Sequence, residues 1–241
     1  ESISGAYDYT LYGYENEAYT LDVTADAINI TAIKPIGVIR AAQTLVQMAE
    51  GWDGTAALEA VSIKDWPAFK LRGYMHDVGR SFISADELVK QVELFSRFKV
   101  NTFHWHLTEN QAWRFEVKAY PQLTSSESMT RFAGQYYTQE DCKRVMAAAK
   151  KHGVIVVPEI DMPGHSEAFK RAMGFDMQSP QGKAVLKKVL DEVAEVFADA
   201  PYIHIICMIQ IGEHIAAGIS IIQSGSAAGI LIGHGNKGTA V

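Results

Sequence analysis

Side chains that can move protons or bind polar ligands gather at three places, each near the end of a short apolar run. They are Arg72, His76, Asp77 and Arg80 around the first run, His104, His106, Glu109 and Asn110 around the second, and Glu159, Asp161 and His165 around the third. An unpaired charge at the buried end of a strand is unfavourable by roughly several kcal/mol, so such groups usually serve a site. Three groups placed alike on successive runs predict one active-site face.

Two other interpretations of these residues stay open. His104 and His106 alternate along a predicted strand and therefore share a side, so they form a metal site if His165 or Asp161 supplies a further ligand. Alternatively, Glu159 and Asp161 are buried ion-pair partners of Arg72 or Arg80, and their role is structural.

The elements that must position these residues alternate between strand and helix. Predicted strands cover residues 71–78, 100–107, 154–162 and 202–206, and predicted helices cover residues 84–98, 137–153 and 179–199. Ser84 and Thr138 are predicted N-caps, with Glu87 and Asp141 at the capping-box position. The alternation predicts a parallel sheet in an α/β fold, either doubly wound or a (β/α)₈ barrel. In both, ligands bind at the carboxyl ends of the strands.

The amino-terminal residues follow a different pattern. Strand-like alternation covers residues 19–23 and 27–33, and a helix is predicted after Pro35 with Val38, Leu45 and Met48 on its apolar face. Trp66 and Pro67 mark a boundary, so residues 1–67 are predicted to form a small α+β domain.

Composition excludes some classes of partner. The 241 residues are 48% hydrophobic and 21% charged, with a formal net charge of −6. No basic patch suits a phosphate backbone, so no nucleic acid partner is expected. No charge-free apolar run of about 18 residues precedes the tail, so no membrane partner is expected either.

Three motifs carry a resemblance to a known family. They read RGYMHDVGRSF, VNTFHWHLTENQAWRFEVKAYPQLT and YYTQEDCKRVMAAAKKHGVIVVPEIDMPGHS. In this order and spacing they resemble the β-N-acetylhexosaminidases of glycoside hydrolase family 20, from about Ala18 to Ile205. The resemblance implies a (β/α)₈ TIM-barrel-type catalytic domain behind a small α+β domain. Because such a barrel needs about 250 residues, we expect residues 68–205 to supply only its first half.

The resemblance also implies an activity, which is hydrolysis of terminal β-linked N-acetylglucosamine or N-acetylgalactosamine from oligosaccharides or glycoconjugates. It implies a substrate-assisted retaining mechanism in which the acetamide oxygen of the sugar attacks the anomeric carbon. Arg72 matches the arginine that holds sugar hydroxyls, and Glu109 matches an acidic position, usually Asp, that partners His165. His165 matches the histidine that tunes the catalytic acid. No cofactor and no metal are implied, and the expected location is periplasmic or secreted.

The resemblance stops after the fourth predicted strand. The family carries an adjacent Asp-Glu pair there, in a segment like HIGGDE, whereas this chain reads YIHIICMIQIGEH and has Glu213 as its sole acid after Asp199. Residues 206–241 form an Ile- and Gly-rich tail, which we interpret as an aberrant continuation such as a frameshift. We therefore expect impaired catalysis, with an inactive sugar-binding relative and a metal-dependent hydrolase using His104, His106 and His165 as alternatives.

Overall fold

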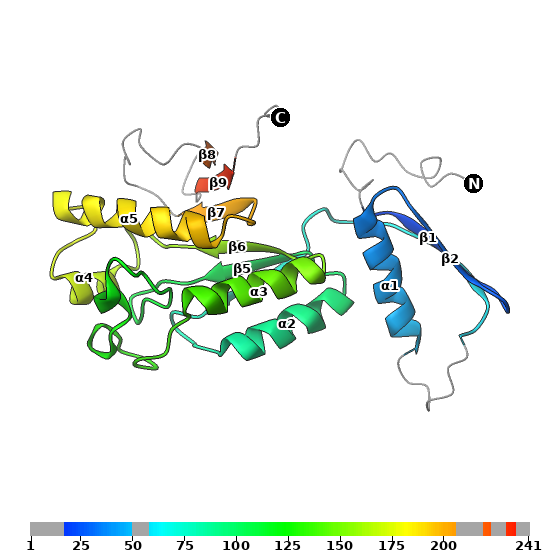
Figure 1. Ribbon diagram of the computed structural model, residues 1–241, viewed down its shortest axis with the longest axis horizontal. Helices are drawn as coiled ribbons and strands as arrows, with labels where there is room; N and C mark the ends of the chain where they lie inside the picture. Colours follow the sequence, from blue (N-terminus) through cyan, green and yellow to red (C-terminus); the bar gives the residue numbers. More distant parts are fainter. Residues whose placement is uncertain (1–16, 50–57, 206–218, 223–229, 235–241) are drawn as a thin grey trace.

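The computed structural model describes residues 17–49, 58–205, 219–222 and 230–234. These residues form two sheets (Figure 1). The first has the strand order β2-β1-β3 and is antiparallel, with β1 (Tyr19–Val23) between β2 (Ile28–Ala32) and β3 (Val61–Asp65). The second has six strands in the order β4-β5-β6-β7-β9-β8.

The small sheet packs on helix α1 (Pro35–Ala49). Alternate residues of β1 are buried, and Tyr19, Leu21 and Val23 form a core with Ala41 of the helix. Gly37 lies so close to β1 that an added Cβ would sit 2.6 Å from the carbonyl oxygen of Ala18. The apolar face predicted for this helix was wrong at one position, since Val38 is 46% exposed and Gly37 takes the inward position. Strand β3 was not predicted.

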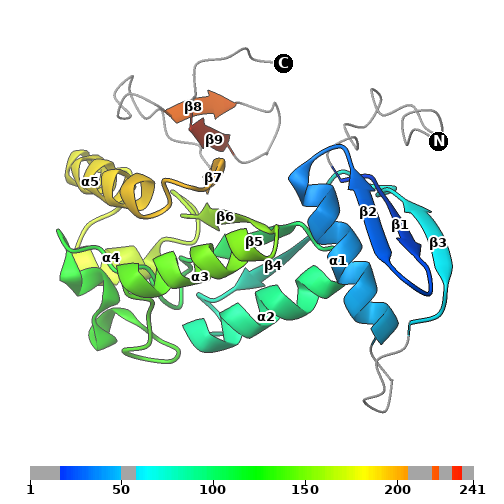
Figure 2. The same ribbon diagram turned by 45° about the vertical axis from the view of Figure 1, so that its right-hand side comes forward.

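Four parallel strands make up the larger sheet's first part. They are β4 (Gly73–Asp77), β5 (Thr102–His106), β6 (Ile155–Glu159) and β7 (Tyr202–Ile205). Helices α2 (Ala85–Arg97), α3 (Gln139–Lys151) and α5 (Pro180–Val196) lie along one side of them (Figures 1 and 2). The short helix α4 (Glu167–Met173), which was not predicted, and the 3-10 turns η3 (Pro121–Thr124) and η4 (Ser126–Ser128) lie in the connections.

The predicted helix starts agree with the structure. Ser84 Oγ accepts a hydrogen bond from the backbone N–H of Glu87 at 3.3 Å. Thr138 and Asp141 form a reciprocal capping box at the start of α3. Such caps satisfy N–H groups that a helix cannot bond internally and contribute about 1 kcal/mol each.

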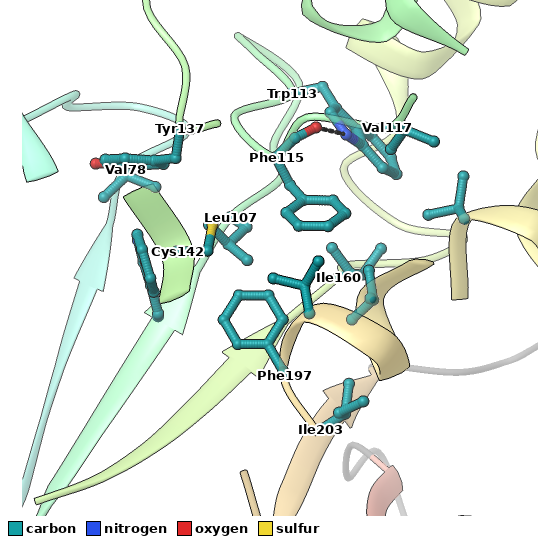
Figure 3. Close-up of a cluster of buried hydrophobic side chains, with 14 of the residues drawn as sticks. Val78, Leu107, Trp113, Phe115, Val117, Tyr137, Cys142, Ile160, Phe197 and Ile203 are labelled. Atoms are coloured by element: carbon teal, nitrogen blue, oxygen red, sulfur yellow. Dashed lines mark hydrogen bonds between the residues drawn. The ribbon is translucent and has the colours of Figure 1, made fainter. Parts of the chain in front are cut away.

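The alternation of side chains in β5 separates a dry face from a polar face. Phe103 and Trp105 are fully buried toward the helices, where the Trp105 ring lies 4.9 Å from Tyr137 and 6.1 Å from Phe197 (centroid to centroid). Leu107, Phe115 and Phe197 continue this core (Figure 3). Burying each such side chain stabilises the fold by about 1.5–3 kcal/mol. His104 and His106 consequently face the opposite side of the sheet.

The sheet changes direction after β7. Strand β9 (Ile230–His234) pairs with β7 in antiparallel fashion, with Ile205 opposite Ile230, and β8 (Ile219–Ile222) pairs antiparallel with β9. The rest of the predicted tail, including Glu213, lies outside the described residues. Among the described helices, none has the length and apolar character that a membrane crossing needs.

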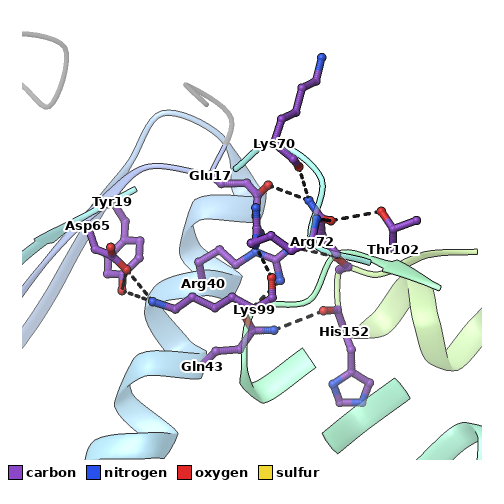
Figure 4. A network of polar contacts seen from close by, with 12 residues as sticks. Glu17, Tyr19, Arg40, Gln43, Asp65, Lys70, Arg72, Lys99, Thr102 and His152 are labelled. Atoms are coloured by element: carbon purple, nitrogen blue, oxygen red, sulfur yellow. Dashed lines mark hydrogen bonds and ion pairs between the residues drawn. The ribbon is translucent and has the colours of Figure 1, made fainter. Parts of the chain in front are cut away.

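A polar network joins the small domain to the amino ends of the parallel strands (Figure 4). The Glu17 carboxylate pairs with the guanidinium groups of Arg40 and Arg72, each at 2.5 Å. Arg40 is 2% exposed and also donates to the carbonyl of Gly153 at 3.0 Å, at the end of α3. Burial lowers the pKa of Arg40, and the Glu17 charge opposes that effect. Arg72 therefore binds Glu17 at the junction between the small antiparallel sheet and the parallel strands.

Candidate active site

Four side chains from three separate segments meet beyond the carboxyl ends of β4, β5 and β6. We call Asp77, Arg80, Glu109 and His165 the carboxyl-edge group. Arg80 Nη1 lies 2.6 Å from Asp77 Oδ2, and Arg80 Nη2 pairs with Glu109 and lies 3.3 Å from Nδ1 of His165. His165 Nδ1 faces both carboxylate oxygens of Glu109, with Oε2 at 2.9 Å. The structure thus brings together Glu109 and His165, the two residues predicted to be catalytic.

Glu109 is the buried centre of this group. Its side chain has no exposed surface, whereas the side chains of Arg80 and His165 are 46% and 45% exposed. The backbone N–H of Asn110 donates to Glu109 Oε2 at 2.6 Å and adds a third hydrogen-bond donor. Gly79 packs directly on Glu109, because a Cβ there would collide with Glu109 Cβ. A carboxylate held by so many donors keeps its orientation while its two partners face outward.

His165 lies in the turn between β6 and α4. Its φ of +49° is in the left-handed region, which is uncommon for residues other than glycine and is often found at functional positions. Asn110 Oδ1 accepts a hydrogen bond from the backbone N–H of Glu167 at 3.2 Å. The loop after β5 therefore contacts the start of α4 and holds this turn beside Glu109.

Arg72, which was predicted to hold sugar hydroxyls, is not part of the carboxyl-edge group. It precedes β4, whereas Asp77 ends that strand, and five residues of strand span about 16 Å. Its Nε donates to the carbonyl of Lys99 and its Nη1 to that of Phe69, both at 2.7 Å, in addition to the Glu17 ion pair. Arg80 is the arginine at the correct end of the strand.

A second polar cluster lies on the inner face of the sheet, and we call it the Glu159 cluster. Glu159 Oε2 lies 2.5 Å from His104 Nε2, 2.8 Å from His106 Nδ1 and 3.3 Å from His204 Nδ1. Burial by itself would raise the pKa of Glu159, but its close contacts with these three histidines hold it well below its ordinary value. Burial likewise lowers the pKa of His106, yet the bond to Glu159 and its charge raise it overall. The ion pair of Glu159 with an arginine, left open from the sequence, is replaced by contacts with histidines.

Asp161 lies between the two groups and is 1% exposed. Its Oδ1 atom has no hydrogen-bond partner among the described residues. Burial raises the pKa of Asp161, and the charges of Glu159 and Glu109 add to that effect while His165 and His106 oppose it. Asp161 therefore holds a proton more readily than an ordinary aspartate does.

Metal binding was one alternative for the histidines. Within the described ranges, potential ligand atoms converge in two sets, which are His104, Glu159 and His204, and His106, Glu159 and Asp161. In each set the atoms lie within 4.8 Å of one another. Neither set contains His165, so the predicted trio of His104, His106 and His165 is not brought together. His165 pairs with Glu109 instead.

Sequence reasoning missed two residues of the polar face. The sequence analysis lists Arg80 among the polar residues but gives it no role. Its position after β4, at the carboxyl end of the strand, was the signal that could have identified it. His204 stands between Ile203 and Ile205, which are each 1% exposed. That alternation places His204 on the side opposite the core, where it reaches Glu159.

Comparisons with known proteins agree on one family. The model described as "Glycosyl hydrolase family 20, catalytic domain" matches residues 69–206, and "Glycosyl hydrolase family 20, domain 2" matches residues 8–66. A beta-hexosaminidase of Vibrio furnissii is 36% identical over an alignment of 170 residues that covers 65% of this chain and 28% of that protein. Beta-hexosaminidase 1 of Coccidioides posadasii is 39% identical over an alignment of 165 residues that covers 67% of this chain and 27% of that protein.

Solved structures give the same result. A beta-N-acetylhexosaminidase from Bacteroides fragilis superposes with a TM-score of 0.73 at 36% identity, covering 82% of this chain and 43% of that one. An exo beta-N-acetylglucosaminidase from Vibrio harveyi, solved in complex with N-acetylglucosamine, has a TM-score of 0.70 at 33% identity, covering 78% of this chain and 35% of that one. The chain thus spans less than half the length of each of these relatives.

Proposed function

Because the chain belongs to glycosyl hydrolase family 20, we propose that its carboxyl-edge group forms part of the site of an exo-acting β-N-acetylhexosaminidase. The same matches confirm the family and the partial (β/α)₈ barrel predicted from the motifs. The proposed substrate is a terminal β-linked N-acetylglucosamine or N-acetylgalactosamine of an oligosaccharide or glycoconjugate. The observation that carries the proposal is the convergence of Arg80, Glu109 and His165 at the carboxyl ends of parallel strands.

Each residue of this convergence suits one part of the chemistry. The Arg80 guanidinium is half exposed, and its planar fork matches a pair of neighbouring sugar hydroxyls. With Nδ1 of His165 facing Glu109, Nε2 is the ring nitrogen that can contact a general acid. Glu109 fixes the orientation of the imidazole. In a substrate-assisted reaction the sugar acetamide is the nucleophile, so the protein needs to supply an acid and a carboxylate that orients the acetamide.

One specific observation supports a second candidate function, that of a sugar-binding relative without turnover. The sequence has no adjacent Asp-Glu pair after β7, and its sole acid beyond Asp199 is Glu213. The carboxyl-edge group does not depend on those acids for its geometry. It can therefore retain a sugar without a general acid to protonate the leaving oxygen.

Two measurements on the full chain test these proposals. Isothermal titration calorimetry with an N-acetylglucosamine-derived thiazoline, which mimics the cyclised intermediate, reports sugar binding, with glucose as the matched control. Hydrolysis of a chromogenic N-acetyl-β-glucosaminide, with and without EDTA, reports turnover and any need for a metal. Thiazoline binding without hydrolysis favours the second candidate, and absence of thiazoline binding overturns both.

We also propose a periplasmic or secreted location. The support is that the proposed substrates, glycan or chitin fragments, are polymers met outside the cytoplasm. Fractionation of host cells with an antibody against the chain tests this, and recovery in the cytoplasmic fraction alone would contradict it.

A further inference from the structure

Arg114 is a buried cation whose donors all reach backbone carbonyls. Its side chain is fully buried, and Nε donates to the carbonyl of Val78 at 3.0 Å. The two terminal nitrogens donate to four further carbonyls at 2.7–3.2 Å, which belong to Gly79, Arg131, Phe132 and Gln135. A guanidinium has five N–H donors, and each of them has a carbonyl here.

The charge of Arg114 is held without a carboxylate partner among the described residues. Nη1 also contacts the Met129 sulfur at 3.2 Å. The rings of Phe82 and Phe132 lie 5.4 Å and 5.9 Å from Cζ. Burial lowers the pKa of Arg114 to about 10, so it remains a cation at neutral pH. Such a group is unfavourable to bury unless its hydrogen bonds are complete, which indicates a selected arrangement rather than an incidental contact.

The carbonyl acceptors come from two segments that are far apart in the sequence. Val78 and Gly79 form the turn between Asp77 and Arg80, directly after β4. Arg131, Phe132 and Gln135 belong to the connection between η4 and α3, where Phe132 and Gly134 have φ angles of +50° and +74°. Arg114 therefore joins the loop after β5 to the turn that carries Arg80.

The geometry of this turn determines where Arg80 points. The Ser81 N–H donates to the Asp77 carbonyl at 3.1 Å, and the Arg80 N–H donates to Asp77 Oδ1 at 3.0 Å. With the carbonyls of Val78 and Gly79 held inward by Arg114, the Arg80 side chain leaves the turn toward Glu109 and His165.

We propose that Arg114 is a positioning residue that fixes the turn of residues 78–80 and thereby holds Arg80 in the carboxyl-edge group. The positioning is a property of the fold, and only its effect on sugar affinity rests on the proposed function. Lysine cannot substitute, because an ammonium has three donors on a flexible stem and cannot bond five carbonyls in two segments.

The test compares Arg114→Met and Arg114→Lys with a matched core variant, Val189→Ala. Val189 is fully buried on α5, the helix that precedes β7, and β7 lies three strands away from β4 in the sheet. Hydrogen–deuterium exchange is measured for the amides of Arg80 and Ser81, and thiazoline affinity is measured by calorimetry, both at a temperature where every variant is folded. Arg114→Lys carries the comparison if Arg114→Met does not fold.

The expected result is exchange at Arg80 and Ser81 that is faster by about tenfold or more in the Arg114 variants than in Val189→Ala. Thiazoline affinity is expected to fall about tenfold in the Arg114 variants and to stay within about twofold in Val189→Ala. If a folded Arg114 variant exchanges the amides of Arg80 and Ser81 no faster than Val189→Ala does, the inference is overturned. If the unsubstituted chain binds no thiazoline, the proposed function fails, and the exchange data still decide the role of Arg114.

Discussion

Nδ1 of His165 lies 2.9 Å from Oε2 of Glu109, although 56 positions separate the two residues in the chain. Glu109 follows the strand β5 and His165 follows its neighbour β6, so the parallel register of the two strands brings them together. Arg80, after β4, contacts the same carboxylate. One buried acid thus orients both exposed side chains before any ligand arrives, and such preorganisation lowers the entropy lost on binding.

We predict that Glu109→Gln weakens thiazoline binding about tenfold to a hundredfold, because charge-assisted hydrogen bonds are worth about 1.5–3 kcal/mol. The Gln amide replaces one of the two carboxylate oxygens with an NH2 group, which would face one of the donors of Arg80, His165 or Asn110. Glu109→Asp keeps the charge and is the matched control for side-chain length. Calorimetry measures both, and equal affinity for Glu109→Gln and the unsubstituted chain would rule out this role.

Arg80→Met and Arg72→Met are predicted to have opposite effects. Arg80→Met abolishes thiazoline binding, because it removes the half-exposed guanidinium fork that is proposed to hold the sugar hydroxyls. Arg72→Met retains affinity but lowers the free energy of unfolding by about 3 kcal/mol, because it removes one of the two guanidinium partners of Glu17, whose side chain is 13% exposed. If Arg72→Met lost thiazoline binding and Arg80→Met kept it, Arg72 would be the arginine that holds the sugar hydroxyls, as the motif match predicts.

The two arginines show what the sequence could and could not provide. Both lie beside the same apolar run, so composition and spacing mark each as a candidate. Strand direction separates them, because the carboxyl ends of parallel strands form one edge and Arg72 stands before the strand. The motif match predicted that Arg72 binds the sugar, whereas the rule that ligands bind at the carboxyl ends of parallel strands favours Arg80.

Other parts of the fold were predictable for clear physical reasons. The parallel strands and the helices α2, α3 and α5 combine strong periodicity with caps such as Ser84 and Thr138. Helix α4 has seven residues and no side-chain cap bond, so it leaves little local signal. The convergence of three histidines on Glu159 depends on the pairing of β6 with both β5 and β7, which no single segment encodes.

We predict a pH window for stability from the Glu159 cluster. The lowered pKa of Glu159 contributes stability that is present above its ordinary value of 4.5 and is lost as the pH falls. The raised pKa of His106 contributes stability that is present below its ordinary value of 6.5 and is lost as the pH rises through the folded value. Urea midpoints across pH 3–9 (roughly the range over which these groups titrate) are expected to decline on both sides. Glu159→Gln should flatten the profile, and an unchanged profile in that variant would contradict the prediction.

Asp161→Asn is predicted to stabilise the protein at pH 7 by about 1 kcal/mol, because it removes a poorly bonded buried charge. The raised pKa of Asp161 means that the folded state binds its proton more tightly, so the ionised form is destabilising above the ordinary value of 3.8. The gain should therefore disappear below that pH. Asp77→Asn, which weakens the Arg80 pair, is the matched control and should not stabilise. Chemical denaturation measures both, and a loss of stability in Asp161→Asn at pH 7 would contradict the prediction.

The reversal of direction after β7 sets a rule for any attempt to engineer turnover into this scaffold. Chain segments leaving β4, β5 and β6 all reach the edge where Arg80, Glu109 and His165 meet, and the carboxyl end of the parallel strand β7 lies at the same edge. Strand β9 runs the other way, with Gly233 opposite Tyr202, so it ends at the far edge of the sheet. An introduced Asp-Glu pair must therefore be placed directly after Ile205, because the same pair grafted at the end of β9 would be separated from the sugar by the full length of a strand.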